Sequence, residues 1–411
     1  MRLAFLTSTP LSPTTGSGTF VALDGLVRGL ERLGHVARLR PLRVRTTFHT
    51  LDRWLYNVGV LLSPPECDVI VGVDLDGFLW ARSRRRPFVV MLKGIIADEL
   101  RNERGLVRTL LRVQAHWERL NTGRADRVVV PSRYSASVAG EVYGVPPEKL
   151  AVVPEPIDLA EWRRRFARAD RRPATRPTVL SVARMYPRKR LADLLEAVRI
   201  LRARIPRVQV RIVGEGPESV RLRALHRRLG LGDTVVFLGE VQRTALAVEY
   251  VSAHCFCLPT VQEGFGIVFA EAMAAGLPVV GCRAAAVPEI VEDRRTGLLV
   301  NPGSPDALAT AMETLLMNEP LRKELGAAGT RRVEAFDVER VAQRFVEILP
   351  LARTSRTALG ASPSPRPTAT RSRSGRQRRT SASSAASRWL TATITCSTSR
   401  SGGRSIHRRG W

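Results

Sequence analysis

The sequence predicts an α/β protein built from two doubly wound domains, and two observations lead to this fold class. Short apolar runs alternate with longer polar or amphipathic stretches, as in parallel sheets whose strands are joined by crossover helices. The length of 411 residues also exceeds what one hydrophobic core supports, since chains of this size split into domains. We therefore expect two sheets, each with its own core.

The first domain is predicted to occupy residues 1–162. Its first segment, RLAFLTS at 2–8, is typical of a buried strand, and a loop rich in Gly, Ser, Thr and Pro separates it from a helical apolar period at 20–34. The apolar start is more typical of such a strand than of a signal peptide. Three further strands are expected at 68–73, 87–92 and 125–132.

A linker is predicted at 163–177, where the sequence is charged, contains Pro and has no apolar period. A second domain is predicted at 178–335. The carboxyl strand ends of the two domains should face each other across a cleft that suits a nucleotide-bearing ligand. Six strands are expected in this half, at 177–183, 208–214, 234–239, 255–259, 278–281 and 297–300.

Two segments follow the second domain. A helix is expected within 336–352, with Val338, Val341 and Phe345 on one face. The tail, 353–411, is dense in Ser, Thr, Arg and Gly without an apolar period, which predicts disorder. Two interpretations of the tail remain open, an arm that associates with RNA or a membrane and a fortuitous extension of the coding sequence.

The segment FHTLDRWLYNVGVLL at 48–62 also allows two interpretations. Its aromatic residues and Arg53 suit a helix that lies on a membrane surface. Leu51, Leu55 and Val58 share one helical face and equally suit an ordinary core. We favour the core.

The formal net charge of +27 is divided unevenly along the chain. Residues 353–411 contain thirteen Arg and no acidic residue, which leaves +14 on residues 1–352. Basic charge favours acidic lipids, phosphorylated substrates or nucleic acid, but the core has no recognition motif, so no specific nucleic-acid partner is expected. No apolar run reaches the roughly 20 residues that span a bilayer. We expect a cytoplasmic protein, with peripheral attachment at the inner face of the membrane as the alternative.

Two glutamates mark the first candidate site. A strand ends near Pro259, a loop carries Glu263 to Gly266, and helical spacing follows, with Glu271 inside the helix and Gly276 as its stop. The glycines permit a close approach to a ligand, and free amides at the helix start favour an anion or hydroxyl groups. The alternative is that Glu263 is a capping acid and Glu271 a solvated helix residue.

A second motif, SVARMYPRKR at 181–190, places Arg184 at the end of a strand and Lys189 five residues later. Two cations in a strand-to-helix loop suit a diphosphate, whose negative charge grows as a nucleotide departs. The flanking Arg188 and Arg190 are expected on the solvated surface.

Several motifs occur in a fixed order along the chain. They are ADRVVVPSRYSA at 125–136, VYGVPPEKLAVVPEPIDLAEW at 142–162, R-x-x-x-x-K at 184–189, IVGEGP at 212–217, FLGEV at 237–241 and EGFGIVFAE at 263–271. This series resembles the retaining glycosyltransferases of family 4, the glycosyl transferases group 1, and the resemblance covers about residues 1–350. It implies the GT-B fold, with two facing Rossmann-like domains, and sugar transfer from a nucleotide donor with retention of configuration and usually without a bound metal.

The resemblance assigns roles to four charged residues. Arg184 and Lys189 would hold the donor diphosphate, and Glu271 would accept hydrogen bonds from the ribose hydroxyls. Glu263 would orient the donor sugar. The two cations and the helix-start amides would take the place of a metal ion, so no metal and no other cofactor is expected.

The resemblance also implies donor contacts through backbone and small residues in three loops. The N-terminal loop TTGSGTF would reach the donor phosphate or the acceptor, and the FLGEV segment would lie near the donor base. These candidates are Gly264, Phe265 and Gly266 after the first glutamate, Gly16 and Gly18 in the N-terminal loop, and Gly239 and Val241 in FLGEV.

The sequence departs from the family pattern at four places. Ala183 and Arg190 stand where the family has glycine, before the Arg and after the Lys of the phosphate motif. Lys93 stands where the family often has His, and it would contact the donor sugar, a phosphate or the acceptor. Glu155 and Pro156 replace the usual Asn-Gly turn. In the family the last helix, here within 336–352, crosses back to the first domain.

The functional hypothesis is a retaining, metal-independent hexosyltransferase with its donor on the second domain. The acceptor, a sugar, glycan or lipid-linked hydroxyl compound, would bind the first domain, and UDP, GDP and ADP remain open as donor nucleotides. A covalent intermediate would need a carboxylate beside the anomeric carbon, where Glu263 is the candidate, and we assign it positioning instead. The alternatives are a nucleotide-sugar epimerase of the same fold and a basic nucleic-acid-binding protein.

Overall fold

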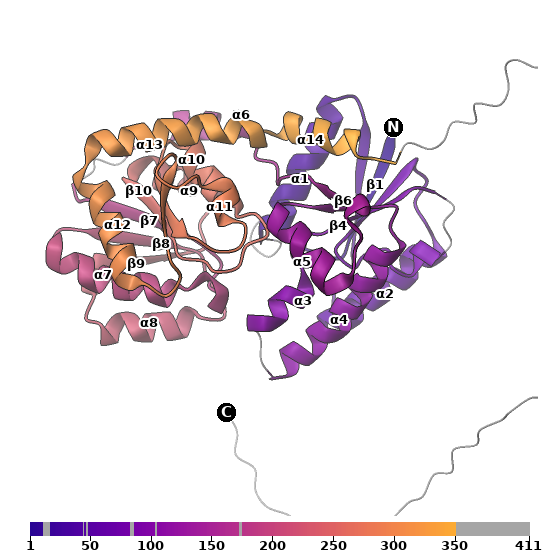
Figure 1. Ribbon diagram of the computed structural model, residues 1–411, viewed down its shortest axis with the longest axis horizontal. Coiled ribbons are helices and arrows are strands. Elements are labelled where there is room, and N and C mark those ends of the chain that lie inside the picture. Colours follow the sequence, from indigo (N-terminus) through magenta and orange to yellow (C-terminus); the bar gives the residue numbers. More distant parts are fainter. Residues whose placement is uncertain are drawn as a thin grey trace, which may run out of the picture. The chain divides into compact units, whose positions relative to one another are not determined.

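The computed structural model describes residues 1–10, 17–43, 45–46, 48–82, 86–102, 105–171 and 175–350. Gly16 and the predicted tail lie outside these residues. Two six-stranded sheets, each with only parallel pairings and each flanked by helices, make up the described chain (Figure 1). The predicted α/β fold class with two doubly wound sheets is confirmed.

The first sheet has the strand order β2-β1-β3-β4-β5-β6. Its strands alternate between two hydrophobic clusters, since Leu3 and Phe5 join one cluster while Ala4 and Leu6 join the other, on the opposite face. The elements of this half are β1 (Arg2–Thr7), α1 (Ser17–Arg32), β2 (Val36–Pro41), α2 (His49–Leu62), β3 (Val69–Val73), β4 (Phe88–Met91), α3 (Ile96–Glu99), α4 (Gly105–Arg124), β5 (Arg127–Val130), α5 (Arg133–Tyr143), β6 (Leu150–Val152) and α6 (Leu159–Arg168).

The second sheet has the order β12-β11-β10-β7-β8-β9 and one large hydrophobic cluster. All six of its strands lie where the apolar runs predicted them. The elements are β7 (Thr178–Val182), α7 (Leu191–Arg204), β8 (Gln209–Val213), α8 (Ser219–Arg228), β9 (Val235–Gly239), α9 (Arg243–Ser252), β10 (Cys255–Leu258), α10 (Ile267–Ala274), β11 (Val279–Cys282), α11 (Val287–Ile290), β12 (Gly297–Val300), α12 (Pro305–Met317), α13 (Glu319–Arg332) and α14 (Val338–Glu347).

The strand β2 is absent from the sequence-based expectations. Arg38 and Arg40 alternate with the apolar Ala37 and Leu39, and β2 pairs only with β1 because it lies at the edge of its sheet. An edge strand tolerates charged residues on a face that nothing covers. Because arginines alternate with apolar residues in β2, the segment contains no continuous apolar run, and a search for such runs does not find the strand.

The expected core face of α2 is wrong. Leu51 and Leu55 are 47% and 48% exposed, and the helix instead buries Asp52, Tyr56 and Asn57. The burial of polar residues is possible because they have partners. The Asn57 amide, for example, donates to the Arg53 carbonyl at 2.8 Å and its oxygen accepts from the Gly77 amide at 2.6 Å.

The first part of the predicted linker is helical, because α6 continues to Arg168. Trp162 and Phe166 lie one turn apart on α6, with ring centroids 5.1 Å from each other. Both rings pack edge-on against Tyr250 of α9, at 5.6 and 6.4 Å. The apolar face of this short helix consists of only two aromatic residues. Because arginines surround them in the sequence, the segment shows no clear apolar periodicity.

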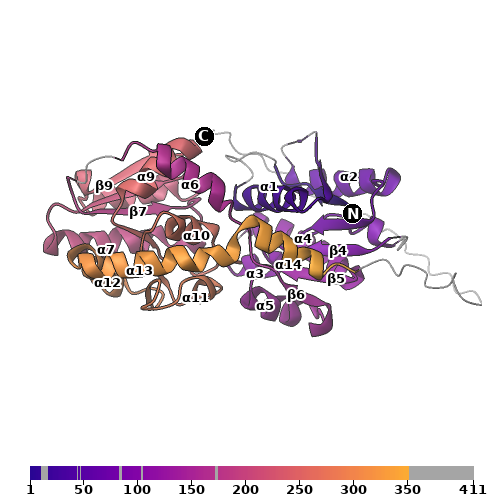
Figure 2. The same cartoon turned by 90° about the horizontal axis from the view of Figure 1, so that it is seen from above.

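The last helix, α14, packs on α1 (Figure 1, Figure 2). Phe345 of α14 joins the hydrophobic cluster of the first sheet, 6.0 Å from Phe5 between ring centroids. A side chain at Gly29 of α1 would collide with the Val338 carbonyl, so this glycine permits the close approach. Among the described residues, no helix has the length and apolar character needed to cross a membrane.

Candidate active site

The two cations predicted for a diphosphate follow β7 in one loop. Arg184 comes two residues after the end of β7, is exposed, and has its guanidinium carbon 5.6 Å from the centre of the Tyr186 ring. Lys189 ends a short 3-10 turn that leads through Arg190, at φ 53°, into α7. The strand end and the helix start thus hold both cations at the carboxyl edge of the second sheet.

The two predicted carboxylates follow β10, the strand next to β7. Glu263 lies in the loop before α10, and Glu271 is inside that helix, as predicted. Gly266 is the residue before α10 and has φ 97°, and a Cβ there would lie 2.7 Å from the Phe269 ring. Only glycine adopts this conformation without strain in so small a space.

Backbone hydrogen bonds join the loops after β7 and β10. The Val261 amide donates to the Arg188 carbonyl at 3.0 Å, and the Thr260 hydroxyl donates to the same oxygen at 3.3 Å. As a result, Lys189 and Glu263 form an ion pair in which the side chains are only 12% and 11% exposed. The structure therefore brings together two residues that are 74 positions apart in the sequence.

Glu263 does not cap α10, because the helix has no side-chain cap and begins after Gly266. The capping alternative for Glu263 is therefore wrong. The solvated alternative for Glu271 is wrong as well, since Glu271 is 6% exposed and its carboxylate accepts a hydrogen bond from the Tyr250 hydroxyl at 3.0 Å. Both carboxylates are held by a specific partner.

Burial raises the pKa of Glu271 to about 7, although the positive charge of Arg243 and the hydrogen bond from Tyr250 lower it. A buried carboxylate that is ionised only near neutral pH is costly to the fold. Such perturbed groups cluster at functional sites. Tyr250 and Arg243 were not predicted from the sequence, because Tyr250 looks like one more apolar residue of α9.

This pKa predicts how a substitution at Glu271 changes stability with pH. The carboxyl group binds its proton more tightly in the folded chain (pKa about 7) than in the unfolded chain (4.5), so the free energy of unfolding falls as pH rises through this window. The full loss is about 3 kcal/mol, at about 1.4 kcal/mol per pKa unit. We expect Glu271→Gln to be more stable than the wild type at pH 8, with the difference shrinking towards pH 5.

Urea denaturation of both proteins across this pH range measures the effect. Tyr250→Phe is the matched control, since it keeps the Glu271 charge and removes the hydroxyl that stabilises it. This variant should lose stability, and more so at pH 8 than at pH 5. A constant difference between Glu271→Gln and the wild type at all pH values would contradict the raised pKa.

The glycine candidates have different surroundings. Gly264 faces the first half of the chain, where a Cβ would lie 2.9 Å from the Lys93 carbonyl oxygen, and its own carbonyl accepts from the Ser135 hydroxyl at 3.3 Å. Phe265 is buried, with its ring 5.2 Å from that of Phe336. Gly18, in the first turn of α1, is exposed, and a Cβ there would lie 3.8 Å from Ile267 at the start of α10.

The FLGEV candidates lie at the end of β9, two strands away from β7. Gly239 has φ 67°, and its carbonyl accepts from the Gly214 amide at 2.7 Å. Val241 is half-buried against the hydrophobic cluster of this half. Gly16 lies outside the described residues, so its predicted contact has no counterpart here.

Further hydrogen bonds link the two halves near Gly264. The Gln262 amide donates to the Asp98 carboxylate at 2.7 Å, and Glu289 accepts from the amides of Arg133 and Tyr134 at 2.9 and 2.7 Å. Arg188 is 24% exposed and lies 3.8 Å from Glu99, so its expected place on the solvated surface is wrong. The loops that follow the strands of the two sheets are therefore in direct contact.

Lys93 follows β4 and forms an ion pair with Glu155 at 2.6 Å. The two side chains are 6% and 10% exposed. Both are departures from the family pattern, so two of the substituted positions contact each other. Glu155 was not predicted as a site residue, and only its unusual place in a turn signalled it.

We expect Lys93→Met to destabilise the protein, because it leaves the buried Glu155 carboxylate without its partner, which typically costs about 3–5 kcal/mol. The double variant Lys93→Met, Glu155→Gln should recover most of this loss. The exposed pair Lys323 and Glu319 provides the control, where Lys323→Met should change stability by less than about 1 kcal/mol. Equal urea midpoints for Lys93→Met and the wild type would contradict a buried pair.

Among the described residues, no group of three or more His, Cys, Asp or Glu side chains is placed to hold a metal ion. Lys189 supplies positive charge directly at Glu263, the start of α10 follows Glu263 by a few residues, and Arg184 lies in the same loop as Lys189. This arrangement suits an anionic ligand that carries hydroxyl groups.

Two family models match the chain. The model of the glycosyl transferases group 1 matches residues 163–332, and the model of glycosyltransferase family 4 matches residues 24–161. Together they include the second sheet, the strands of the first sheet other than β1, and the loops after β7 and β10.

Two curated relatives have sequences similar to that of this chain. A GDP-mannose-dependent alpha-(1-6)-phosphatidylinositol monomannoside mannosyltransferase of Mycobacterium tuberculosis is 36% identical over 189 residues, 44% of this chain and 48% of the relative. The D-inositol 3-phosphate glycosyltransferase 2 of Catenulispora acidiphila is 36% identical over 206 residues, 47% of this chain and 48% of the relative. The chain thus spans about half the length of these two relatives.

The fold resembles that of the sucrose-phosphate synthase from Thermosynechococcus elongatus, with a TM-score of 0.71 at 21% identity over 84% of this chain and 98% of that chain. Two parallel six-stranded sheets with this likeness form the GT-B fold that the motifs implied. The two family models and the fold lead to one conclusion: this chain belongs to the family 4 glycosyltransferases, the glycosyl transferases group 1.

Proposed function

We propose that this chain is a retaining glycosyltransferase that moves a hexosyl group from a nucleotide sugar to an acceptor hydroxyl without a metal ion. The observation that carries the proposal is the convergence of the β7 and β10 loops, which holds the Lys189–Glu263 ion pair beside the start of α10. The family models and the names of the relatives support the same class of reaction.

In this proposal the ion pair opens when the donor binds. A diphosphate carries more negative charge than one carboxylate, so the Lys189 ammonium group turns to it and leaves Glu263 free to accept hydrogen bonds from the sugar. Arg184 neutralises the second phosphate. As the bond to the sugar breaks, the leaving diphosphate gains charge, and two fixed cations stabilise that charge more strongly than solvent does.

Glu271 holds the ribose in the same proposal. Its buried carboxylate already accepts one hydrogen bond from Tyr250, and ribose hydroxyls would add two more. Hydrogen bonds to the charged form lower a carboxyl pKa. The pKa of Glu271, about 7 in the free protein, therefore falls when the donor binds, and donor affinity should rise with pH up to about 7.

The acceptor hydroxyl attacks the anomeric carbon from the face that the nucleotide leaves, and the departing diphosphate takes the proton. No protein nucleophile is needed, so Glu263 positions the sugar. The names of the relatives suggest GDP-mannose as the donor and an inositol phosphate compound as the acceptor. Because the matches span about half of each relative, these identities are the first to test.

A thermal-shift screen of GDP, UDP and ADP and their sugars, with a chelator present, tests the proposal. A ligand that binds only the folded chain raises the melting temperature. We expect one nucleotide series to raise the melting temperature, and Lys189→Ala to reduce that shift. The absence of a shift with every nucleotide sugar, or a shift that requires a divalent metal, would contradict the proposal. Conversion of the sugar without any acceptor would indicate an epimerase instead.

A further inference from the structure

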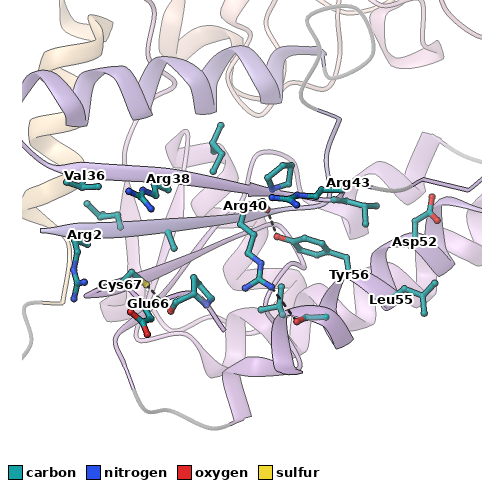
Figure 3. Close-up of a pocket in the computed structure, with 18 of the residues that line it drawn as sticks. Arg2, Val36, Arg38, Arg40, Arg43, Asp52, Leu55, Tyr56, Glu66 and Cys67 are labelled. Carbon is teal, nitrogen blue, oxygen red and sulfur yellow. Dashed lines mark hydrogen bonds between the residues drawn. The ribbon is translucent and has the colours of Figure 1, made fainter. Parts of the chain in front are cut away.

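A cavity of about 1020 Å³ lies away from the candidate active site, between the first sheet and α2 (Figure 3). Strands β1 and β2 form one wall with Arg2, Arg38 and Arg40, and α2 forms the other with Leu55 and Tyr56. The cavity is open because β2 is an edge strand and α2 covers only part of this face. The predicted donor loops contribute no residue to it.

The charge of this cavity is mainly positive. Arg2, Arg38, Arg40 and Arg43 line it, against the carboxylates of Asp52 and Glu66. The Asp52 carboxylate already accepts from the Thr46 amide, at 2.9 and 3.0 Å, and from the Thr46 hydroxyl at 2.8 Å.

Of the four arginines that line the cavity, Arg38 and Arg43 are available for a ligand, because the other two already have partners. Arg2 pairs with Asp68 at 3.3 Å, and Arg40 donates to the carbonyls of Ser63 and Gly59. Arg38 and Arg43, by contrast, have no hydrogen bond or ion pair with any residue that the structure describes. Their guanidinium groups are suited to an anion such as a phosphate.

The helix beside the cavity exposes an apolar stripe. Phe48 is 71% exposed, and Leu51, Trp54 and Leu55 are 47%, 43% and 48% exposed. These residues recur every three or four positions, so they lie on one side of α2 and its N-terminal boundary. Leu55 both belongs to this α2 stripe and lines the cavity, which makes the apolar and the cationic surfaces continuous.

The neighbouring helix α4 also exposes apolar side chains. Gln114 of α4 accepts from Arg53 at 3.1 Å and donates to Thr50 at 2.8 Å, which fixes α4 against α2. The first turns of α4 expose Leu106 and Leu110, at 74% and 41%. Exposed apolar patches of this kind mark interaction surfaces.

We propose that the α2 stripe and the arginine cavity dock on a bilayer that contains anionic phospholipid, with a lipid phosphate between Arg38 and Arg43. Leu, Phe and Trp side chains enter the interface of a bilayer, and arginines beside them bind anionic headgroups. The proposal does not rest on the proposed transferase activity.

The positive charge of the cavity and the apolar stripe beside it favour an anionic bilayer over other occupants of this surface. A second copy of the chain would bring the same arginines against each other in a two-fold contact. Residues 353–411 carry thirteen arginines and no acidic residue. Their positive charge would be repelled by the arginines of the cavity, so this segment does not suit it as an occupant. A nucleic acid would match the charge but not the apolar stripe.

Co-sedimentation of the full chain with vesicles tests the proposal. We expect binding to vesicles of phosphatidylcholine with phosphatidylglycerol and much weaker binding to phosphatidylcholine alone. Leu51→Glu with Leu55→Glu should weaken vesicle binding at least about tenfold, because burying a leucine side chain contributes roughly that factor or more. Arg38→Glu with Arg43→Glu should remove the preference for the anionic vesicles. All four side chains face the surface or the cavity, so the variants should keep the melting temperature.

The matched controls are Val220→Glu, 81% exposed on α8, and Arg199→Glu, 52% exposed on α7. Both should bind vesicles as the wild type does. Equal vesicle binding by the Leu51, Leu55 variant and the wild type would overturn the proposal. So would inorganic phosphate binding without vesicle binding, a dimer that this variant dissociates, or tighter binding to RNA than to vesicles. Nucleotide-induced thermal shifts of the same variants report the donor site separately.

Discussion

Lys189→Ala should lower kcat by about 10²–10³-fold at saturating donor, because removing one group that stabilises transition-state charge typically costs this much. Lys189 is one of the two cations assigned to the diphosphate, and no metal is expected to compensate for it. The measurement is nucleotide release with donor and acceptor present, alongside the melting temperature of the variant.

Two controls separate charge from folding in this experiment. Lys189→Ala leaves the Glu263 carboxylate in a mostly buried site without its partner, so the double variant Lys189→Met, Glu263→Gln restores neutral packing. We expect it to regain stability but not activity. Arg190→Ala removes an adjacent, exposed arginine that pairs with Asp193, and it should retain kcat. Full activity of the double variant would show that Lys189 has only a structural role.

Glu271→Ala should weaken donor binding by about 100-fold or more, because two hydrogen bonds to a carboxylate each contribute roughly 1.5–3 kcal/mol. The wild-type affinity should rise with pH up to about 7, where the Glu271 carboxyl ionises, and the variant should lose this dependence. Calorimetric titration of the nucleotide at pH 5.5, 7 and 8.5 measures both effects.

The control for this experiment is Tyr250→Phe, which keeps the carboxylate and removes only its protein donor. Its dissociation constant for the donor should be within about tenfold of the wild-type value, since the substitution removes only one hydrogen bond. If Glu271→Ala binds the nucleotide as tightly as the wild type does, Glu271 is a structural buried acid and not a ribose ligand.

The fold was predictable wherever strands are buried on both faces. The runs at 177–183 and 255–259 match β7 and β10, two strands in which every residue is buried. Strand β2 was missed for the opposite reason, since its arginines face an open cavity.

The helix α2 shows a second limit of sequence patterns. Its leucines have the spacing of a core face, yet the helix buries Asp52, Tyr56 and Asn57. Periodicity identifies a face but does not say which side of the helix meets the sheet. Only the partners of these polar residues, supplied by distant segments, decide the orientation.

The places of the candidate residues in loops and helices were predictable, but their contacts were not. Arg184, Lys189, Glu263 and Glu271 were placed in the correct loops and helix by their flanking glycines and strand ends. The Lys189–Glu263 pair, the Tyr250 hydrogen bond and the Lys93–Glu155 pair depend on how separate loops meet in space. No local pattern records such pairings.

The central claim is that this chain transfers a sugar from a nucleotide donor, and nucleoside diphosphate release tests it most directly. GDP-mannose and the corresponding UDP and ADP sugars are incubated with the full chain, a phosphatidylinositol acceptor and a chelator, and the nucleotides are quantified. The account predicts that one donor releases its diphosphate in step with a glycosylated acceptor, and that Lys189→Ala slows this release by about 10²–10³-fold. Release from no donor with any inositol, glycan or lipid acceptor would contradict the account.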